Sequence, residues 1–394
     1  MAEIREFHNS NGESKKENFT AKIVKHRLGT AIRILIAVAI VVTIVIVLRT
    51  QYRNQIYTNL VIGGKSDKEN LSDNSYIGTN GSIITYSKDG ISRTNGSGTV
   101  LWNMTYEMQK PIVHQADGIV AVCDYNGHII YMINASGREY EIDTNLPIRD
   151  FAVSKEERVA VILEDAGNSW INLYDISGNQ LVEIKSTMSK TGYPLSVALS
   201  GEVMGVSYFF VDGEKMKSSV TFYNFGGIGE NTSDHIVSSY DYIDSVVPVL
   251  EFIDGENAYA LADNRLMFYS GEKKPVSTSD SFISQNIIGS YKGDKNIGLV
   301  FYDVTGEHKY RLDVYDLNGN LTMNYSFDMD YKDIIISNNQ TIIYNEGQCI
   351  VLNSEGVEKY FGDFEDDIIC LTSTDSNKKY IAITEDAIET LVFE

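Results

Sequence analysis

One short phrase recurs along the chain: a run of apolar residues that ends in a polar turn closed by glycine. Its sharpest copies are Tyr131–Gly137, Leu173–Gly178 and Val314–Gly319. Seven copies, four of them weaker, follow one another at spacings of 37 to 49 residues and close at Gly98, Gly137, Gly178, Gly227, Gly271, Gly319 and Gly356. Units of this length with four short strands are typical of β-propeller blades. Because one unit cannot bury both faces of its sheet, the units must close into a ring.

The strand pattern predicts an all-β propeller of eight blades. The third strands of the units begin near Ile91, His128, Trp170, Val220, Arg265, Leu312, Cys349 and Ala387. The chain ends at Glu394, directly after the eighth of these strands, so this blade lacks an outer strand. Residues 58–62 are the expected donor, because an unpaired sheet edge would leave the ring open. If those residues are linker, the terminal strands share a blade with residues 75–106 and the ring has seven blades.

An apolar run near the amino terminus predicts one transmembrane helix. Residues 34–48 carry no charge, and residues 28–33 extend the run to 21 residues with only Arg33 inside it. About 20 apolar residues cross the ~30 Å of bilayer hydrocarbon, and an Arg side chain near one end reaches the headgroups. We therefore expect a helix over residues 28–48, with a buried core helix as the alternative. No small-residue cleavage site of a signal peptide follows Leu48.

Flanking charge predicts the orientation of this helix. Six Lys or Arg residues lie from Lys15 to Arg33, whereas Arg49 and Arg53 follow the run. Positive charge marks the cytoplasmic side, so the amino terminus is expected in the cytoplasm. The chain then divides into four parts: a cytoplasmic tail (1–27), the transmembrane helix (28–48), a linker that can supply a closing strand (49–74) and an extracytoplasmic propeller (75–394). Within the linker, residues 63–67 are expected to form a turn.

The charge of the globular part excludes one class of partner. Residues 50–394 carry 25 basic and 50 acidic side chains, a net charge of −25. Such a surface repels phosphate backbones before any specific contact can form. Nucleic acid is therefore not an expected partner.

The three cysteines, Cys123, Cys349 and Cys370, lie in or beside apolar strand patterns. A disulfide between Cys349 and Cys370 is possible if strands of neighbouring blades meet. Small buried thiols are the favoured alternative. So few cysteines in an exported domain argue against a disulfide scaffold and suit a bacterium that does not rely on oxidative folding.

The sequence offers no recognisable catalytic, cofactor or metal motif. The six histidines lack the spacings of transition-metal ligands, and the acidic segments 328–330 and 363–367 lack the pattern of a calcium loop. No Gly-x-Ser-x-Gly elbow or phosphate-binding glycine loop is present. We therefore assign no catalytic, cofactor-binding or metal-binding residue. Paired carboxylates depend on three-dimensional spacing, so an enzyme acting on glycan or a small substrate in the central channel remains the alternative.

Loops on one rim of a propeller are the expected place for recognition. Three hairpins between second and third strands are expected to be long, at residues 164–168, 210–215 and 303–307. The connection 226–242, continuing to residue 244, is expected to be the longest irregular insert. Neutral variation of surface loops is the alternative explanation for all four.

Aromatic side chains provide the candidate binding residues. The chain has 25 tyrosines, and most aromatic residues are expected to fill the gaps between blades. Four that fall near the long loops are expected to contact a partner peptide or stack on sugars: Phe209, Phe210, Tyr240 and Tyr242. Packing in the core is the competing expectation for each of them.

One unit resembles a known repeat. Gly98 and Trp102 resemble the Gly-x-x-x-Trp end of a pyrroloquinoline-quinone (PQQ)-type propeller repeat, and later units keep the glycine but replace the Trp. Together with the single span, residues 28–394 are similar to an uncharacterised family of membrane-anchored, PQQ-like or WD-like β-propeller proteins from anaerobic Gram-positive bacteria. Quinoprotein dehydrogenases of this fold use adjacent cysteines, which this chain lacks. Other propellers with this repeat are non-catalytic envelope scaffolds, and that is the role the resemblance implies.

The sequence therefore predicts a single-pass cell-membrane protein with an extracytoplasmic β-propeller and no cofactor. Its expected role is that of a non-catalytic binding or scaffold module for an envelope protein or a cell-wall glycan. Attachment to the membrane supports this role, because it raises the effective concentration of the propeller near other surface components.

Overall fold

The computed structural model describes residues 19–53, 55–68, 73–188, 190–212 and 215–394. The chain forms two compact units, residues 1–55 and residues 56–394, and each is described by itself. Most of the expected tail, residues 1–18, lies outside the described residues.

The first unit contains one long helix, α1 (Phe19–Arg53). Its stretch His26–Leu48 is long and apolar enough to cross a membrane, and the large apolar side chains of that stretch are exposed. An apolar helix is thus confirmed where one was expected. The helix extends beyond residues 28–48 at both ends, so residues 19–27 and 49–53 are helical. The predicted orientation, with a cytoplasmic amino terminus, stays a prediction.

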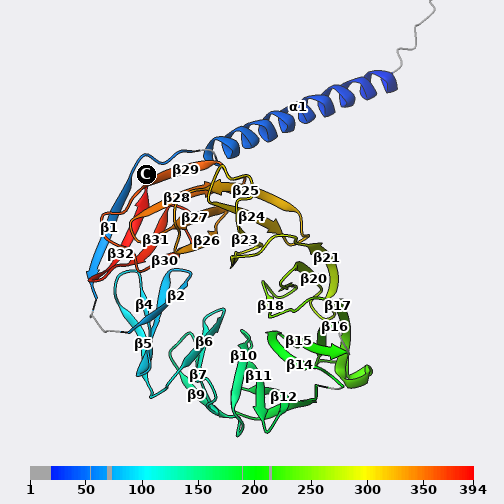
Figure 1. The fold of residues 1–394 in the computed structure, drawn as a ribbon. Coiled ribbons are helices and arrows are strands. Elements are labelled where there is room, and N and C mark those ends of the chain that lie inside the picture. The colour runs from blue at the N-terminus through cyan, green and yellow to red at the C-terminus, as the bar shows by residue number, and fades with distance from the viewer. Residues whose placement is uncertain (1–18, 54, 69–72, 189, 213–214) are drawn as a thin grey trace, which may run out of the picture. The chain divides into compact units, whose positions relative to one another are not determined.

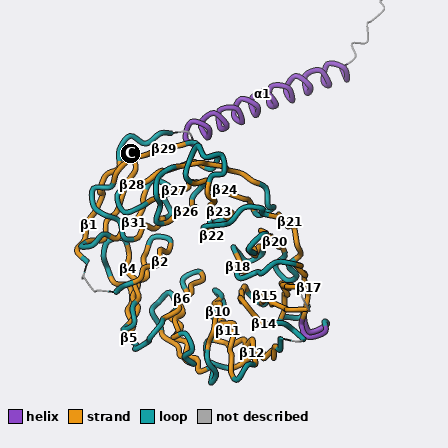
Figure 2. The backbone as a smooth tube through the Cα atoms, viewed as in Figure 1, coloured by secondary structure: helices purple, strands orange, loops and turns teal. Residues whose placement is uncertain are grey.

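The second unit is an eight-bladed β-propeller, as Figures 1 and 2 show. Blades 1 to 3 consist of β2 (Ser75–Thr79), β3 (Ser82–Tyr86), β4 (Gly90–Asn95), β5 (Val100–Thr105); β6 (Pro111–Ala116), β7 (Ile119–Asp124), β8 (Ile129–Ile133), β9 (Glu139–Asp143); and β10 (Ile148–Val153), β11 (Arg158–Asp165), β12 (Asn168–Asp175), β13 (Gln180–Ser186). Blades 4 and 5 consist of β14 (Tyr193–Ser200), β15 (Val203–Asp212), β16 (Lys215–Asn224), β17 (Ile236–Ile243); and β18 (Val249–Phe252), β19 (Asn257–Leu261), β20 (Arg265–Ser270), β21 (Val276–Phe282). Blades 6 and 7 consist of β22 (Gly289–Lys292), β23 (Asn296–Tyr302), β24 (Tyr310–Asp316), β25 (Leu321–Phe327); and β26 (Asp333–Ser337), β27 (Gln340–Tyr344), β28 (Gln348–Asn353), β29 (Glu358–Asp363).

Blade 8 joins the two ends of the propeller sequence. Its strands are β30 (Cys370–Ser373), β31 (Lys379–Ile383), β32 (Ala387–Phe393) and, as the outer strand, β1 (Leu60–Asp67). β1 runs antiparallel to β32, with Leu60 opposite Phe393 and Asp67 opposite Ala387. The eight-bladed ring is therefore confirmed, and the strand proposed at residues 58–62 corresponds to β1.

The expected turn at residues 63–67 is wrong, because these residues continue β1. The register shifts between Ile62 and Gly64, so the strand carries a bulge at this point. A Cβ atom on Gly63 would lie 2.9 Å from Cγ2 of Val392. The two glycines thus permit a bulge and a close approach of neighbouring strands, which local sequence patterns do not distinguish from a turn.

The recurring glycine closes the turn between the third and fourth strands of a blade. In blade 2, Asn134 Oδ1 accepts hydrogen bonds from the backbone N–H groups of Ser136 and Arg138, each at 3.0 Å. Gly137 has a φ of +80°, which favours glycine. The same pair of bonds occurs at Asn95, Asp175, Asp316 and Asn353. In blade 4, two short 3₁₀ turns, η1 (Gly229–Asn231) and η2 (Ser233–His235), occupy this position.

The core lies between neighbouring blades. Cys123 and Met132 of blade 2, for example, pack with Phe151 and Val161 of blade 3, and all four side chains are almost completely buried. Burial of a large apolar side chain contributes about 1.5–3 kcal/mol. The three cysteines are free thiols, two of them buried and Cys370 partly buried. This agrees with the favoured alternative to a disulfide.

The sequence prediction of a long loop is wrong at two of the three positions. β11 continues to Asp165 and β12 begins at Asn168, so only Ala166 and Gly167 form the turn. Both have positive φ values, +48° and +77°, as in the tight hairpin turns that match the twist of long strands. β15 likewise continues to Asp212, and β16 begins at Lys215. A longer connection is confirmed at residues 303–309, between β23 and β24.

The expected irregular insert is also shorter than predicted. Residues 236–243 form β17, the outer strand of blade 4, so Tyr240 and Tyr242 are strand residues. The irregular part is limited to residues 225–235. Alternation of polar and apolar residues in Ser239-Tyr240-Asp241-Tyr242 is the pattern of a half-buried strand.

Candidate functional site

The strands of each blade alternate in direction, which gives the ring two edges. The hairpins between second and third strands and the carboxyl ends of the outer strands lie at one edge, here called the upper rim. The turns between third and fourth strands lie at the other, the lower rim. The first strand of each sheet lies innermost (Figure 1).

Exposed apolar side chains at the lower rim recur from blade to blade. They lie at or next to the start of the outer strand and are Val100, Leu181, Ile236, Val276, Leu321 and Val357. Their repetition at one position marks them as part of the blade motif. A scattered single apolar side chain of this kind needs no functional explanation.

Exposed apolar side chains at the upper rim follow a different distribution. Among the described residues they occur from the connection before blade 4 to blade 6, and we call them the upper-rim patch: Met188, Val211, Met216, Ile243, Phe282, Tyr302 and Val304. Phe282 and Val304 are 66% and 71% exposed. Among the described residues, the other blades have no such side chain near this edge except Phe361 of β29, so the group on blades 4 to 6 is not part of the repeated motif.

Blade 4 supplies the centre of the upper-rim patch. Val211 and Met216 lie opposite each other at the end of the β15–β16 ribbon. The N–H of Asp244 donates to the carbonyl oxygen of Met216 at 2.9 Å, which holds the end of β17 beside them. Ile243, opposite Lys217, therefore lies next to the same end of the sheet.

The four predicted binding residues lie in this same sheet. Phe209 and Phe210 are on β15, Tyr240 and Tyr242 are on β17, and β16 separates the two pairs. Phe209 and Tyr242 are both opposite Ser218. The structure thus brings the four residues onto one blade, directly below the exposed end of its sheet.

The two predicted tyrosines take part in the junction between blades 4 and 5. Tyr242 is 6% exposed, and its hydroxyl lies 2.7 Å from the hydroxyl of Tyr269. Burial raises the pKa of Tyr242 to about 12. The Tyr240 hydroxyl accepts a hydrogen bond from the N–H of Ser277 at 3.0 Å. Both hydroxyls therefore have partners within the propeller.

The two predicted phenylalanines are partly buried. Phe210 packs against the core between blades 3 and 4, and the ammonium of Lys217 lies 4.8 Å from the centre of its ring. Lys217 also pairs with Asp241 at 3.0 Å. The predicted residues and the upper-rim patch thus share blade 4, but the prediction did not include Val211, Met216 or Ile243. The available signal was an apolar residue on each side of a charged hairpin tip.

Ion pairs surround the upper-rim patch. Arg265 makes two bonds to the carboxylate of Asp280, at 3.1 and 2.9 Å, beside Phe282. His308 Nδ1 lies 3.0 Å from the carboxylate of Asp328, next to the connection that carries Val304. This hydrogen bond raises the pKa of His308 and lowers that of Asp328. An apolar centre with a charged surround is the usual composition of a protein interface.

The innermost strands carry two further pairs of titratable side chains. His114 on β6 lies 3.7 Å from Asp150 on β10, and Lys292 on β22 lies 2.6 Å from Glu251 on β18. All four side chains are partly exposed, but surrounding protein replaces much of the hydration of the first pair. Burial therefore lowers the pKa of His114 and raises that of Asp150. Opposite shifts in neighbouring groups are a feature of acid–base sites and of structural pairs alike.

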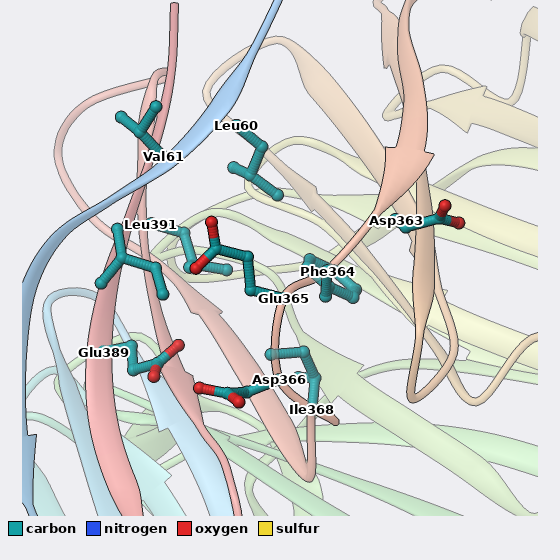
Figure 3. Close-up of a pocket in the computed structure, with 10 residues that line it drawn as sticks. Leu60, Val61, Asp363, Phe364, Glu365, Asp366, Ile368, Glu389 and Leu391 are labelled. Carbon is teal, nitrogen blue, oxygen red and sulfur yellow. The ribbon is translucent and has the colours of Figure 1, made fainter.

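A small pocket lies where the ring closes (Figure 3). Lys65 of β1 bonds to Asp366 at 2.6 Å and lies 2.7 Å from Glu389, whose side chain is 1% exposed. The two carboxylates face each other across the pocket. Burial raises the pKa of Glu389, and the bond to Lys65 lowers that of Asp366. The volume, about 20 Å³, leaves room for one water molecule, so this pocket is structural.

The described part of the chain comprises residues 19–53, 55–68, 73–188, 190–212 and 215–394. There, no three His, Cys, Asp or Glu side chains come together in a group that could hold a metal ion.

The fold is an eight-bladed β-propeller preceded by one apolar helix, and exposed apolar side chains outside the repeated motif gather on blades 4 to 6 at its upper rim. Residues 52–393 match a family of unknown function (DUF5711), and the chain belongs to that family. A family without a known function was expected from the resemblance, whereas the bacterial group and the PQQ-type repeat stay predictions. Comparison with curated proteins finds no significant match.

Two solved structures are similar to this chain at low sequence identity. Apo AztD from Citrobacter koseri is 11% identical, with a TM-score of 0.50, and the match covers 77% of this chain and 86% of AztD. BamB from Moraxella catarrhalis is 13% identical, with a TM-score of 0.49, and the match covers 85% of this chain and all of BamB. At such sequence identities, the similarity is evidence for the fold alone.

Proposed function

We propose that this protein is a membrane-anchored, non-catalytic binding module that presents its upper-rim patch to a partner protein of the cell envelope. One observation carries the proposal: exposed apolar side chains gather on blades 4 to 6 at one edge and are not part of the repeat. Exposed apolar side chains that gather on one part of a surface, with charged groups around them, are typical of an interaction site.

The chemistry of the patch favours a protein over a glycan. Val211, Met216, Ile243 and Val304 are aliphatic or thioether side chains, which gain stability when they are buried against other apolar groups. Sugars are instead bound mainly by hydrogen-bonding groups around flat aromatic faces, and only Phe282 and Tyr302 of the seven patch residues are aromatic. Phe209, Phe210, Tyr240 and Tyr242 have a supporting role in this proposal, because they hold the sheet that carries the exposed end.

The helix determines where the partner is met. With the positive residues before it in the cytoplasm, α1 anchors the propeller on the extracytoplasmic side of the cell membrane. Anchoring confines the propeller to a thin layer and raises its effective concentration toward other envelope components. A patch with modest affinity can then bind a substantial fraction of its partner.

The second candidate is an enzyme that acts on glycan or a small substrate at the centre of the ring. It rests on His114 and Asp150, whose pKa values shift in opposite directions. Asp150→Asn separates the two candidates. The binding proposal expects partner capture to be unchanged, whereas an acid–base site would lose its activity.

Site-specific photocrosslinking tests the proposal. A photoreactive amino acid replaces Val211, Ile243 or Val304 in the full chain, and Leu181 or Leu321 at the lower rim in the controls. Irradiation of intact cells should give a protein adduct from the upper-rim positions and little from the controls. Equal adducts from both rims, or adducts that a glycan-degrading enzyme removes, would refute the proposal.

A further inference from the structure

The ion cluster at the closure of the ring differs from the other ion pairs of the protein. Lys65 of β1 lies directly opposite Glu389 of β32 in the sheet. The Nζ atom of Lys65 lies 2.6 Å from Oδ2 of Asp366 and 2.7 Å from Oε1 of Glu389. Asp366 belongs to the connection between β29 and β30. Among the described residues, Lys65 is the lysine that pairs with two carboxylates.

The two carboxylates have different surroundings. The side chain of Asp366 is 44% exposed, whereas that of Glu389 is 1% exposed and faces it across the pocket (Figure 3). Three apolar side chains line the same pocket: Leu60, Ile62 and Leu391. Although Oε1 of Glu389 lies close to Nζ of Lys65, it is buried without a hydrogen bond of normal geometry. A buried acceptor in this state gains stability when it takes a proton.

This arrangement supplies the groups needed to join a lysine to an aspartate. The ammonium of Lys65 passes a proton to Glu389, which leaves a neutral amine beside the carboxyl group of Asp366. The Nζ–Cγ bond then forms and one C–O bond of Asp366 breaks. That oxygen leaves as water, with one proton returned by Glu389 and one from the attacking nitrogen. Charge and atoms balance, and no oxidant or other reactant is required.

The contacts favour this condensation although the ion pairs oppose its first step. Both carboxylates raise the pKa of Lys65, so the neutral amine is a minor form. The reaction, however, needs to occur only once in the life of each molecule. Reactants held in contact behave as if present at about 10⁵–10⁸ M. An amide also removes the cost of desolvating two charges beside apolar side chains. The pocket, of about 20 Å³, has room for the released water.

We propose that Lys65 and Asp366 form an intramolecular amide crosslink, with Glu389 as the group that transfers the proton. The crosslink joins the first strand of the propeller to the connection that enters blade 8, so it closes the ring covalently. It is separate from the upper-rim patch and does not depend on the function proposed for that surface.

The intact mass of the full chain, purified in detergent micelles and then denatured, tests this proposal. An ion pair leaves the mass unchanged, whereas the crosslinked chain is lighter by one water molecule. Trypsin should release one branched peptide that contains Lys65 and Asp366. Lys65→Arg keeps the charge but cannot form this amide, and Glu389→Gln keeps the shape but not the proton acceptor. Both variants should have the full mass of their sequences.

A second ion pair provides the matched control. Lys292 lies 2.6 Å from Glu251, the same distance as in the proposed crosslink, but has no second carboxylate partner among the described residues. No branched peptide should contain Lys292. The proposal is overturned if the wild-type chain has the full mass of its sequence, or if the loss of water persists in Lys65→Arg. It is also overturned if Glu389→Gln is crosslinked as completely as wild type, or if Lys292 is joined to Glu251.

Discussion

The backbone of Leu60 pairs with that of Phe393, so the first strand of the propeller sequence completes the blade formed by the last three. The residues just before β1 strengthen this closure. Tyr57 is 3% exposed and stacks on Phe393 at a ring distance of 5.4 Å. Its hydroxyl lies 2.9 Å from the ammonium of Lys359 and 2.6 Å from the side-chain amide of Gln340.

Loss of the Tyr57 side chain should destabilise the closure of the ring. Tyr57→Ala removes a buried aromatic ring and the hydroxyl beside a buried lysine, with an expected loss of about 3–5 kcal/mol. Tyr57→Phe keeps the ring and should cost about 0.5–1.5 kcal/mol. Denaturant unfolding of the full chain in micelles measures both. Val304→Ala, at a side chain that is 71% exposed, serves as control and should change stability by less than about 0.5 kcal/mol.

The repeat glycines should differ sharply in their tolerance of alanine. Gly137 has a φ of +80°, and an added Cβ would lie 2.8 Å from Cβ of Trp102 in the preceding blade. Gly137→Ala should therefore cost at least about 1–2 kcal/mol. Gly227 has open space around it and no positive φ, so Gly227→Ala should be neutral or slightly stabilising. Equal unfolding midpoints for the two variants would contradict this difference in turn geometry.

The closing ion cluster should give a definite pH dependence. Because the folded protein raises the pKa of Glu389 above its ordinary value of 4.5, the folded state holds more protons than the unfolded state in that window. Stability from this group is present at low pH and is lost as pH rises through the folded pKa. Glu389→Gln should remove that loss. The variant is compared with wild type in unfolding experiments across the acidic range, and an unchanged pH profile would contradict the assignment.

The pKa values of two histidines should be shifted in opposite directions from the ordinary value. Burial holds the pKa of His114 below 6.5, whereas the bond to Asp328 raises that of His308 above it. His114 therefore contributes stability that falls as pH drops through 6.5, and His308 contributes stability that falls as pH rises through its folded pKa. NMR titration of the imidazole protons measures both. Asp328→Asn should lower the pKa of His308 and leave that of His114 unchanged.

Sequence reasoning succeeded where the structure is local and repeated. The turn at Asn134 and Gly137 is determined by a few neighbouring residues, so five copies of it reveal the blades. The outer strand of blade 8 was inferred because eight third strands leave one sheet incomplete. The error at residues 63–67 arose because a bulge and a turn use the same glycines.

The candidate site was predicted less well, because exposure depends on residues far away in the sequence. Tyr242 is buried by Tyr269 of the next blade, a contact that no local pattern shows. Val211 and Val304 are apolar residues like many in the core, and only the ring geometry places them outside it. The sequence shows the type of each residue. It does not show which distant residues cover that side chain in the folded ring.

Capture of a partner by full-length variants in intact cells shows whether the upper-rim patch is the binding surface. Val211→Asp and Val304→Asp introduce charge into the upper-rim patch at exposed positions, so stability should change by less than about 0.5 kcal/mol. Leu321→Asp makes the same change at the lower rim. If the partner binds the upper-rim patch, the two upper-rim variants lose about tenfold or more of the crosslinked partner while Leu321→Asp retains it. Full capture by the upper-rim variants, with loss in Leu321→Asp, would contradict it.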